Sequence, residues 1–557
     1  PDCFFKLLYC LADDFIFLRL NSRVLSKIKK LKLSQLNLIF YVSLFIVFFQ
    51  NWPFVSKTLQ VFPFVDNAYL IISLVVVVVL LFNITINLLN LFIPLRPLLS
   101  LFLLIGAVTN YFASNFGTIF NDVMIINVME TSLDESLDII NINFTLNLLF
   151  LGLLPSLLLY RIAMVNNTYL QNAGRILVAT LLSTLIISGL ITLSTKEYAS
   201  FIRYHKELRT YITPLYPFYS SIRVIQNKFF SKNKQYKNLS AKFELPKNEA
   251  MAELIVVIVG ETARADHFSL NGYSRLTNPM LSKESKLISF TQVSSCGTST
   301  SISLPCMFSF RDKEHFKLKD AQYRENVLDT IAKTGTKILW RDNNSSSKHV
   351  ADRLVYEDFK TKDRNPICDP ECRDIGMLKD LDLFINKAPG NKLIVMHQMG
   401  SHGPAYHKRY PKAFEKFTPA CKKGLEDCAQ NEIINAYDNT ILYTDYFIAS
   451  TINFLKQFDN NYEITLIYVS DHGESLGEKG LYLHGLPSSI APKEQTHIPL
   501  IIWAGKNSDI DYPKTRLLKD QPHSHDIIAD TLLKLFEVNT DMYANYEKPL
   551  IVRSDKH

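Results

Sequence analysis

Five apolar runs, each close to the ~20 residues that a membrane-spanning helix needs, dominate the first part of this 557-residue chain. They cover residues 36–52, 68–93, 95–113, 144–160 and 176–193. Residues 75–79 are all valine, but the spanning length of that run and its flanks favour a helix over a strand. The sequence therefore predicts a transmembrane domain of five helices over residues 36–195.

Basic residues set the expected orientation of these spans. The lysine cluster between Lys27 and Lys32 precedes the first run, and Arg96 and Arg161 fall in connections on the same side of the membrane. Because lysine and arginine accumulate on the cytoplasmic side, residues 1–35 are predicted to be a basic cytoplasmic extension. Five spans then place everything after about residue 195 on the outer side. The basic and aromatic stretch 196–248 is expected to be an interfacial connector and linker.

Residues 249–557 alternate apolar runs with helical patterns, as an α/β domain does. The expected strands are 254–259, 337–340, 393–396, 466–469 and 498–503. Such runs suit strands that are buried on both faces, so a mainly parallel sheet flanked by helices is predicted. In sheets of this kind the functional site lies beyond the carboxyl ends of the strands.

Six of the eight cysteines form three close pairs in this second part of the chain. The pairs are Cys296 with Cys306, Cys368 with Cys372, and Cys421 with Cys428. They do not make a zinc-type array, and on the outer side of a membrane they indicate three local disulfides in an oxidising compartment. Six free buried thiols are the alternative. The net charge of +7 comes without a dense basic patch interleaved with aromatics, so no nucleic-acid partner is expected.

Metal-type ligands follow the predicted strands. Glu261 comes after the first strand, His397 and His402 after the third, and Asp471 and His472 after the fourth; His484 lies a little further on. Carboxylate oxygen and imidazole nitrogen are ligands that zinc accepts. A single histidine at a strand end is more often a packed or capping residue, but several together with carboxylates favour metal binding.

The stretch from Ser295 to Phe308, SCGTSTSISLPCMF, is rich in hydroxyl groups and contains two of the paired cysteines. A hydroxyl is a poor nucleophile at neutral pH, and coordination to a dication would activate it. Thr298, Ser299 and Thr300 all remain candidates on this reasoning. A loop or a helix cap is the alternative interpretation.

Two further groups of polar residues could contact a substrate. Asn344 and Lys348 follow the second strand and could bind phosphate oxygens, although Lys348 alone would be read as a surface lysine. Asn127, Thr131 and Glu135 lie in the long outer connection between the third and fourth runs. Their spacing of four would place them on one face of a helix, where they could contact a lipid headgroup or simply face solvent.

Several motifs carry a resemblance to a known family. They are GETARADHFSLNGY, SCGTSTSISLPCMFS, WRDNNSSSK, HQMGSHGPAY, INAYDNT, YVSDHGESLGEKGLYLHG and APKEQ. With them the chain, from about residue 36 to near its end, resembles the membrane-bound phosphoethanolamine transferases that modify lipid A. This family includes the mobile colistin-resistance enzymes and belongs to the alkaline-phosphatase superfamily.

The resemblance implies a role for each of these residues. Thr300 would be the nucleophile, and Glu261, Thr300, Asp471 and His472 would hold zinc, with one ion or more in the site. His402 and His484 would bind a second zinc or the transferred phosphoryl group. Asn344, Lys348 and His397 would contact the substrate, and Asn127, Thr131 and Glu135 would contact the ethanolamine headgroup. The three cysteine pairs would be the family's disulfides.

The resemblance also implies the reaction. A monomeric, multi-pass protein of the bacterial inner membrane, with its catalytic domain (residues 249–557) in the periplasm, would transfer phosphoethanolamine from phosphatidylethanolamine to a lipid A phosphate. A covalent phospho-threonine would be the intermediate, and polymyxin or colistin resistance the result. The alternatives are a phosphoglycerol donor or another envelope acceptor such as a core sugar or glycan, a hydrolase of the superfamily, and a catalytically silent membrane scaffold or sensor.

Overall fold

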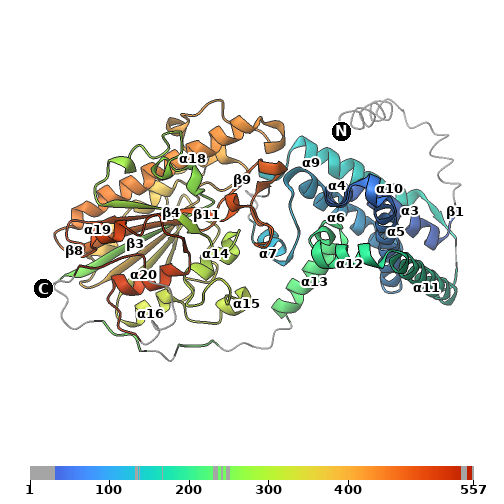
Figure 1. The fold of residues 1–557 in the computed structure, drawn as a ribbon, viewed down its shortest axis with the longest axis horizontal. Helices are drawn as coiled ribbons and strands as arrows, with labels where there is room; N and C mark the ends of the chain where they lie inside the picture. Colours follow the sequence, from blue (N-terminus) through green and yellow to red (C-terminus); the bar gives the residue numbers. More distant parts are fainter. Residues whose placement is uncertain are drawn as a thin grey trace. The chain divides into compact units, whose positions relative to one another are not determined.

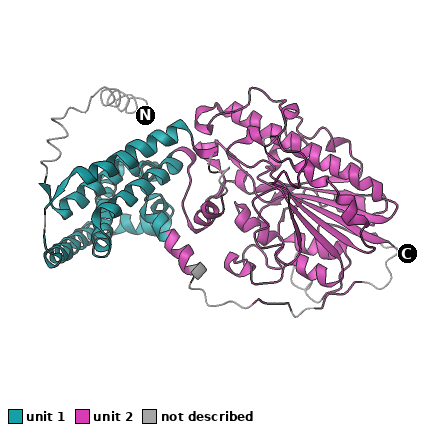
Figure 2. Ribbon diagram, turned by 180° about the vertical axis from the view of Figure 1, so that it is seen from behind, with its two compact units in different colours: residues 1–114, 141–219 teal, residues 115–140, 220–557 magenta. Residues whose placement is uncertain are grey.

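The chain divides into two compact units in the computed structural model (Figure 2). The structure describes residues 32–131, 136, 138–165, 167–229, 236–239, 242–245, 251–369, 371–540 and 549–554. Unit 1 comprises residues 1–114 and 141–219, and unit 2 comprises 115–140 and 220–557. The outer connection 115–140 thus groups with the soluble part of the chain. Nearly all of the predicted N-terminal extension lies outside the described residues, and the domain boundaries expected near residues 195 and 248 stay predictions.

Unit 1 is helical, as the apolar runs predict. Its apolar helices are α3 (Gln35–Gln50), α4 (Trp52–Val61), α5 (Phe64–Leu89), α6 (Leu95–Phe116), α9 (Ile142–Asn147), the π-helical η1 (Leu148–Leu153), α10 (Leu154–Arg161) and α11 (Tyr169–Leu193). Within the described residues, four helical stretches are long and apolar enough to cross a membrane, with α9, η1 and α10 forming one of them. The bent pair α3 and α4 brings the number to five if it counts as one span.

The first predicted span is therefore a bent element, with an angle of 60° between α3 and α4. Pro53 stands at the start of α4 and lacks the N–H that would continue the hydrogen bonds of α3. Asn51 fills the break, because its side-chain amide donates to the carbonyl oxygens of Ile46 and Thr213 and its Oδ1 accepts from the Thr213 N–H. The bend is thus fixed by buried hydrogen bonds within unit 1.

After these spans the chain is mostly helical up to residue 229. The short strands β1 (Lys32–Leu33) and β2 (Ala163–Met164) pair in parallel. The predicted connector contains α12 (Thr195–Tyr204), the 3-10 helix η2 (Leu208–Tyr211) and α13 (Leu215–Phe229). In unit 2, the outer connection carries α7 (Asp122–Glu130), which Asn121 caps by accepting the Met124 N–H.

An eight-stranded sheet forms the centre of unit 2. Its order is β12-β4-β11-β8-β3-β7-β5-β6. All five predicted strands are present, as β3 (Ala252–Gly260), β5 (Lys337–Asp342), β7 (Lys392–His397), β8 (Tyr462–Ser470) and β11 (His497–Ala504). The unpredicted strands are β4 (Leu287–Ser294), β6 (Val355–Asp358) and β12 (His523–Ser524). The sheet is mainly parallel, with β11 antiparallel to both of its neighbours.

Helices cover both faces of this sheet (Figure 1). Helices α14 (Thr300–Met307), α16 (Val327–Lys333) and α20 (Ile527–Leu535) share an apolar core with alternate residues of β3 such as Ile255, Val257 and Val259. Helix α18 (Gln430–Leu455) lies on the opposite face (Figure 1). Shorter elements of unit 2 are α15 (Leu318–Ala321), α17 (Leu381–Asn386), α19 (Tyr512–Arg516), β9 (Ser475–Leu476) and β10 (Tyr482–Leu483). Burial on both faces explains the uninterrupted apolar strands.

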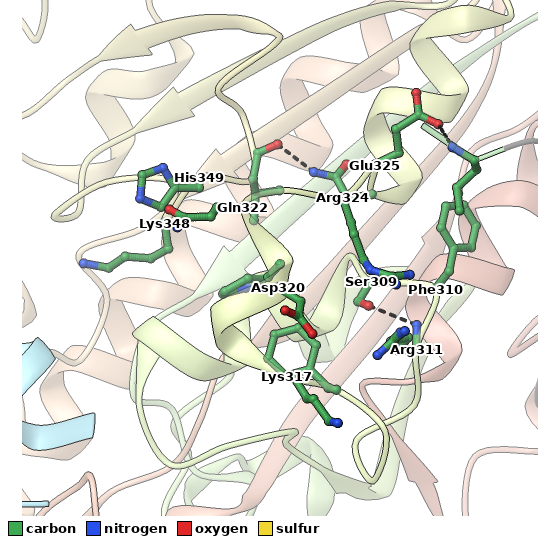
Figure 3. A pocket seen from close by; sticks show the side chains of 16 residues that line it. Ser309, Phe310, Arg311, Lys317, Asp320, Gln322, Arg324, Glu325, Lys348 and His349 are labelled. Atoms are coloured by element: carbon green, nitrogen blue, oxygen red, sulfur yellow. Dashed lines mark hydrogen bonds between the residues drawn. The ribbon is translucent and has the colours of Figure 1, made fainter. Parts of the chain in front are cut away.

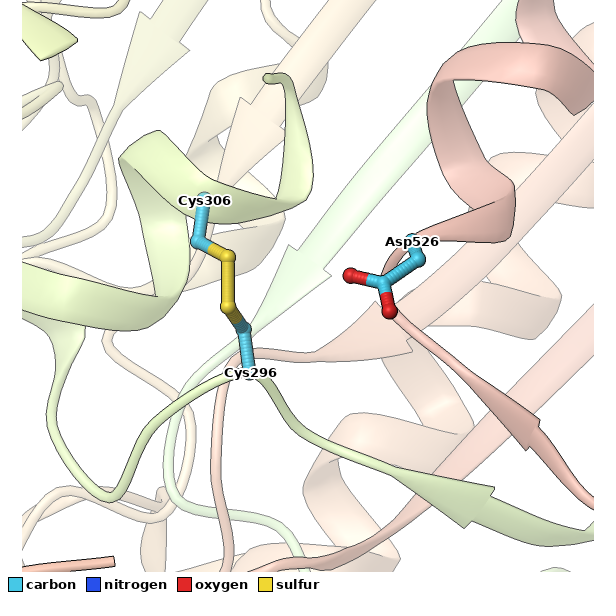
Figure 4. Close-up of side chains that lie close together, drawn as sticks. All are labelled: Cys296, Cys306 and Asp526. Carbon is cyan, nitrogen blue, oxygen red and sulfur yellow. A yellow bond between two sulfur atoms is a disulfide. The ribbon is translucent and has the colours of Figure 1, made fainter. Parts of the chain in front are cut away.

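All three predicted disulfides form. The bond between Cys296 and Cys306 joins the loop before α14 to the helix itself, and the Asp526 carboxylate lies nearby (Figure 4). Because the two sulfur atoms are bonded to each other, they are not thiolate ligands. Asp526 accepts hydrogen bonds from the Lys313 N–H and the Ser524 hydroxyl. The disulfide is therefore a structural support for the hydroxyl-rich loop.

Candidate active site

Three metal-type ligands meet at the carboxyl edge of the sheet. Glu261 follows β3, and Asp471 and His472 follow β8, the strand beside it. One ligand atom from each lies within 4.8 Å of the others, and all three residues are fully buried. The His472 Nε2 is 3.4 Å from a Glu261 oxygen and 3.3 Å from Asp471 Oδ2. We call these three residues the ligand cluster.

The electrostatics of the ligand cluster fit a cation. Burial raises the pKa of Asp471, and the charge of Glu261 adds to this, so that it reaches about 6. Burial would also raise the pKa of Glu261, but His472 and the other nearby histidines hold it well below its ordinary value. Asp471 Oδ2 has no hydrogen-bond partner within the described residues. Two buried carboxylates with an open oxygen and an imidazole form a donor set that suits a dication such as zinc.

The hydroxyl of Thr300 contacts the ligand cluster. Thr300 is the first residue of α14, and its Oγ1 donates a 3.1 Å hydrogen bond to Glu261 Oε2 and lies 3.5 Å from His472 Nε2. The Thr298 hydroxyl donates instead to the carbonyl oxygen of Leu486, and the Ser299 hydroxyl lies 3.2 Å from that of Ser301. The positive end of the α14 dipole also favours negative charge at Thr300. These contacts support Thr300 among the three candidates.

Asn344 and His397 border the same carboxylate. The Asn344 side-chain amide donates to Glu261 Oε2 and to the carbonyl oxygen of Gln398, each at 2.8 Å. The His397 Nε2 lies 4.0 Å from Glu261 Oε2, and its Nδ1 lies 3.2 Å from Asp342 Oδ2. Burial opposes protonation of His397, but Asp342 raises its pKa. Asp342 was missed, although its position at the end of β5 was a usable signal.

His484 and His402 lie beside His472 of the ligand cluster. The His484 ring centroid is 4.2 Å from that of His472, and the His402 ring is 6.1 Å from that of His484. Glu474 Oε2 lies 3.0 Å from His484 Nδ1, and against the effect of burial it raises the pKa of His484 to about 9. Tyr406 in turn donates to Glu474 Oε1. Glu474 was also missed, although it closes the SDHGE motif.

His525 connects the hydroxyl-rich loop to the sheet, and no local pattern signals it. Its Nδ1 accepts the Cys296 N–H at 3.1 Å, so the proton is on Nε2, which donates to the carbonyl oxygen of Ser470 at 2.9 Å. Complete burial lowers the pKa of His525 to about 3. Because Ser470 precedes Asp471, this neutral histidine fixes the loop before Thr300 against the strand that carries two ligands.

The outer connection also reaches the site. Asn127 Oδ1 accepts a 2.7 Å hydrogen bond from the Ser301 hydroxyl, and Glu130 Oε2 lies 2.6 Å from Lys348 Nζ. The expected helical face of Asn127, Thr131 and Glu135 does not continue past Glu130, where α7 ends. Thr131 is an extended C-cap residue whose hydroxyl donates back to the Asn127 carbonyl oxygen. Glu135 lies outside the described residues, so the roles of this trio stay predictions.

Further contacts hold the connection against the rest of unit 2. Asp138 pairs with Lys408 and Arg409. The Phe116 ring packs edge-on against Tyr482 with centroids 6.4 Å apart. The connection is thus held by ionic and aromatic contacts as well as by Asn127 and Glu130.

A pocket adjoins Lys348 on the catalytic unit (Figure 3). Charged side chains from three segments line it, namely Arg311, Lys317, Asp320, Arg324, Glu325 and Lys348. In Figure 3 the Lys348 ammonium points away from the Asp320 carboxylate. The Lys348 side chain therefore extends toward α7, where it pairs with Glu130.

Comparisons with known proteins agree with this architecture. The family model described as "Phosphoethanolamine transferase EptA/EptB" matches residues 78–229, and the sulfatase model matches residues 253–538. Phosphatidylethanolamine transferase Mcr-1 of Escherichia coli is 43% identical over 452 residues, which is 79% of this chain and 83% of the relative. Phosphoethanolamine transferase EptA of Escherichia coli K12 is 36% identical over 462 residues, with 79% and 82% covered.

Solved structures of phosphoethanolamine transferases share this architecture. The integral membrane lipooligosaccharide phosphoethanolamine transferase A of Neisseria meningitidis superposes with a TM-score of 0.87 at 33% identity, covering 93% of this chain and 98% of that one. The C-terminal periplasmic domain of transferase EptC from Campylobacter jejuni matches at 40% identity with a TM-score of 0.50, covering 56% of this chain and 95% of that one.

A helical membrane domain and a sulfatase-like catalytic domain in the periplasm are thus both present. The chain belongs to the phosphoethanolamine transferase family of the alkaline-phosphatase superfamily.

Proposed function

We propose that this inner-membrane transferase moves phosphoethanolamine from phosphatidylethanolamine to a phosphate of lipid A through a covalent intermediate on Thr300, acting as a monomer. The observation that carries the proposal is the hydrogen bond from the Thr300 hydroxyl to Glu261 inside the ligand cluster. The names of the relatives support the donor and the transferred group. A relative that is 26% identical, the Kdo(2)-lipid A phosphoethanolamine 7''-transferase of Escherichia coli, supports the class of acceptor.

Glu261, Thr300, Asp471 and His472 would hold a zinc ion, and His402 and His484 would bind a second zinc or the transferred phosphoryl group. When bound, zinc would favour the ionised form of the threonine hydroxyl and offset charge on the phosphoryl oxygens. The chain's own groups position the reaction. Asn344 and Glu261 are hydrogen-bonded to each other, and Asp342 orients His397.

Transfer takes two displacements at phosphorus. In the first, Thr300 Oγ1 loses its proton and bonds to the phosphorus of phosphatidylethanolamine, and the bond to the diacylglycerol oxygen breaks as that oxygen gains a proton. In the second, a lipid A phosphate oxygen bonds to the same phosphorus, the bond to Thr300 Oγ1 breaks, and Thr300 regains its proton. Asn344, Lys348 and His397 would contact the phosphoryl oxygens, and Asn127, Thr131 and Glu135 the headgroup.

The product would carry an added ammonium group. This positive charge offsets the negative charge of the lipid A phosphates and weakens their attraction for cationic peptides. We therefore expect expression of the chain to confer resistance to polymyxins, including colistin.

Lipid A mass spectrometry of cells that express the chain tests the proposal. We expect Thr300→Ala to abolish the added phosphoethanolamine, whereas Ser299→Ala, which alters a neighbouring hydroxyl that does not contact Glu261, retains it. A mass increase on the Thr300 peptide after incubation with donor alone would reveal the intermediate. Undiminished addition by Thr300→Ala would refute the nucleophile, and addition to a core sugar would refute the acceptor.

A further inference from the structure

A closed ring of contacts includes the Thr300 hydroxyl, and α7 forms one side of the ring. Two of its members belong to α7 and the other five to later elements of unit 2, and each member is bonded to the next or lies within four residues of it. They are Thr300, Glu261, Asn344, Lys348, Glu130, Asn127 and Ser301. Asn127 and Glu130 are three residues apart in α7, so they share a face with about 5–6 Å between their Cβ atoms.

The Lys348–Glu130 ion pair is the exchangeable part of this ring. Lys348 is only 9% exposed in its side chain, whereas Glu130 is 39% exposed. Lys348 has a φ of +48°, a backbone conformation that L-residues avoid and that is typical of functional sites. A partly exposed ion pair adds little to stability, so another pair of charges can replace it at small cost.

We propose that the zwitterionic headgroup of the donor binds between Lys348 and Glu130 and replaces their ion pair. Glu130 then binds the ethanolamine ammonium of the headgroup, and Lys348 binds its phosphate. This inference rests on the proposed function and adds an ammonium-binding residue to it. The phosphate of such a headgroup is opposite in charge to Lys348, and its ammonium is opposite in charge to Glu130. Both side-chain charges therefore stay paired when the headgroup inserts between them. Asn127, one turn earlier on the same helix face, is hydrogen-bonded beside Thr300.

Other carboxylates described around the site are already engaged. Glu261 belongs to the ligand cluster, and Glu474 accepts the Tyr406 hydroxyl and contacts His484. Asp138 pairs with Lys408 and Arg409. Asp320 lines the neighbouring pocket, and the Lys348 ammonium points away from the Asp320 carboxylate (Figure 3). Glu130 is therefore the described carboxylate that lies beside the phosphate-binding lysine.

Calorimetric binding of two soluble probes to the detergent-solubilised full chain tests this inference. The probes are O-phosphoethanolamine and propyl phosphate, which differ chiefly in an ammonium replaced by a methyl group. In a Thr300→Ala background we expect a preference for O-phosphoethanolamine of about tenfold or more, the usual strength of a hydrogen bond between charged groups. Adding Glu130→Gln should remove the preference for O-phosphoethanolamine, whereas Lys348→Met should lower the affinity for both probes to the same extent.

Asp138→Asn is the matched control, because it removes a carboxylate that docks the same connection through Lys408 and Arg409. It should keep the preference. Three outcomes would overturn the assignment of Glu130 as the ammonium-binding residue. They are an unchanged preference for O-phosphoethanolamine in Glu130→Gln, an equal loss of that preference in Asp138→Asn, and a loss of it in Glu135→Gln alone.

A lipid arm separates this inference from the proposed function. Chain with Thr300 intact should release diacylglycerol from phosphatidylethanolamine faster than from phosphatidylpropanol, and Glu130→Gln should narrow that ratio about tenfold or more. No release from phosphatidylethanolamine by the unsubstituted chain would refute the proposed function. Normal release with an unchanged ratio in Glu130→Gln would refute only the role of Glu130.

Discussion

Substituting Gly400 should disable the site through the backbone of Glu261. Gly400 follows β7 with a φ of +52°, and a Cβ added there would lie 2.8 Å from the Glu261 carbonyl oxygen and 3.0 Å from its nitrogen. The first separation is roughly half an ångström shorter than ordinary van der Waals contact. The Glu261 carbonyl oxygen also accepts the Ser401 N–H at 3.0 Å, so it cannot move away freely.

Gly390 provides a matched control for the backbone effect alone. It has a φ of +91°, and nothing lies within 4 Å of its added Cβ. Gly390→Ala should therefore lower the free energy of unfolding by only the ~1–2 kcal/mol of a left-handed L-residue. Gly400→Ala should cost a further ~1–3 kcal/mol for the overlap. Because a shift of about 1 Å can reduce an enzymatic rate ~100-fold, transfer should fall about tenfold to 100-fold.

Thermal unfolding in detergent, zinc content by mass spectrometry and diacylglycerol release measure these differences. Gly400→Ala should bind less of the proposed zinc and release diacylglycerol about tenfold to 100-fold more slowly, while Gly390→Ala should match the unsubstituted chain in both. Equal stability, zinc content and activity in the two variants would refute the claim that Gly400 is required by the close approach of Glu261.

Three other predictions concern the groups that support the site. Asp342→Asn removes the carboxylate partner of His397, and kcat/KM should fall about 10- to 100-fold with the fold unchanged by circular dichroism; an unaltered kcat/KM would contradict this. His525 has a folded-state pKa of about 3 and an unfolded value near ~6.5, so the unfolded chain binds the extra proton between these values. The contribution of neutral His525 to the free energy of unfolding is therefore present above pH ~6.5 and is lost as pH falls toward 3, by at most ~1.4 kcal/mol per pH unit. In thermal unfolding between these pH values, the stability of His525→Gln should depend less steeply on pH than that of the unsubstituted chain; an equal dependence would contradict this. Joint replacement of Cys296 and Cys306 by serine opens a loop with a sequence separation of 10 and should cost ~3 kcal/mol in unfolding experiments; a cost near zero would mean that the reduced loop is already ordered.

The sequence predicts best those elements that have a distinctive local pattern of apolar residues. Continuous apolar runs identified β3, β5, β7, β8 and β11, because these strands are buried on both faces. β4 is fully buried only at Ile288, Phe290 and Val293, and β12 has just two residues, so neither gives such a run. The antiparallel direction of β11 is also unreadable, because direction depends on pairing with distant segments.

The same division holds at the site. Glu261, Asp471 and His472 were found because each follows a strand, and the topology brings those ends together. Residue type and spacing do not distinguish Thr298, Ser299 and Thr300, since only packed geometry shows which hydroxyl contacts Glu261. His525 was missed because it acts through two backbone groups far away in sequence.

The grouping of residues 115–140 with the catalytic unit has a consequence for biogenesis. A chain made from its amino end exports α7 long before β3 and the later strands are synthesised, so one side of the active site reaches the periplasm without the partners it will bind. Ser301 and Lys348 arrive only after the last predicted span has been made. Maturation of the catalytic site is therefore a docking event between an early and a late segment, and a soluble fragment starting at residue 249 would lack Asn127 and Glu130 altogether.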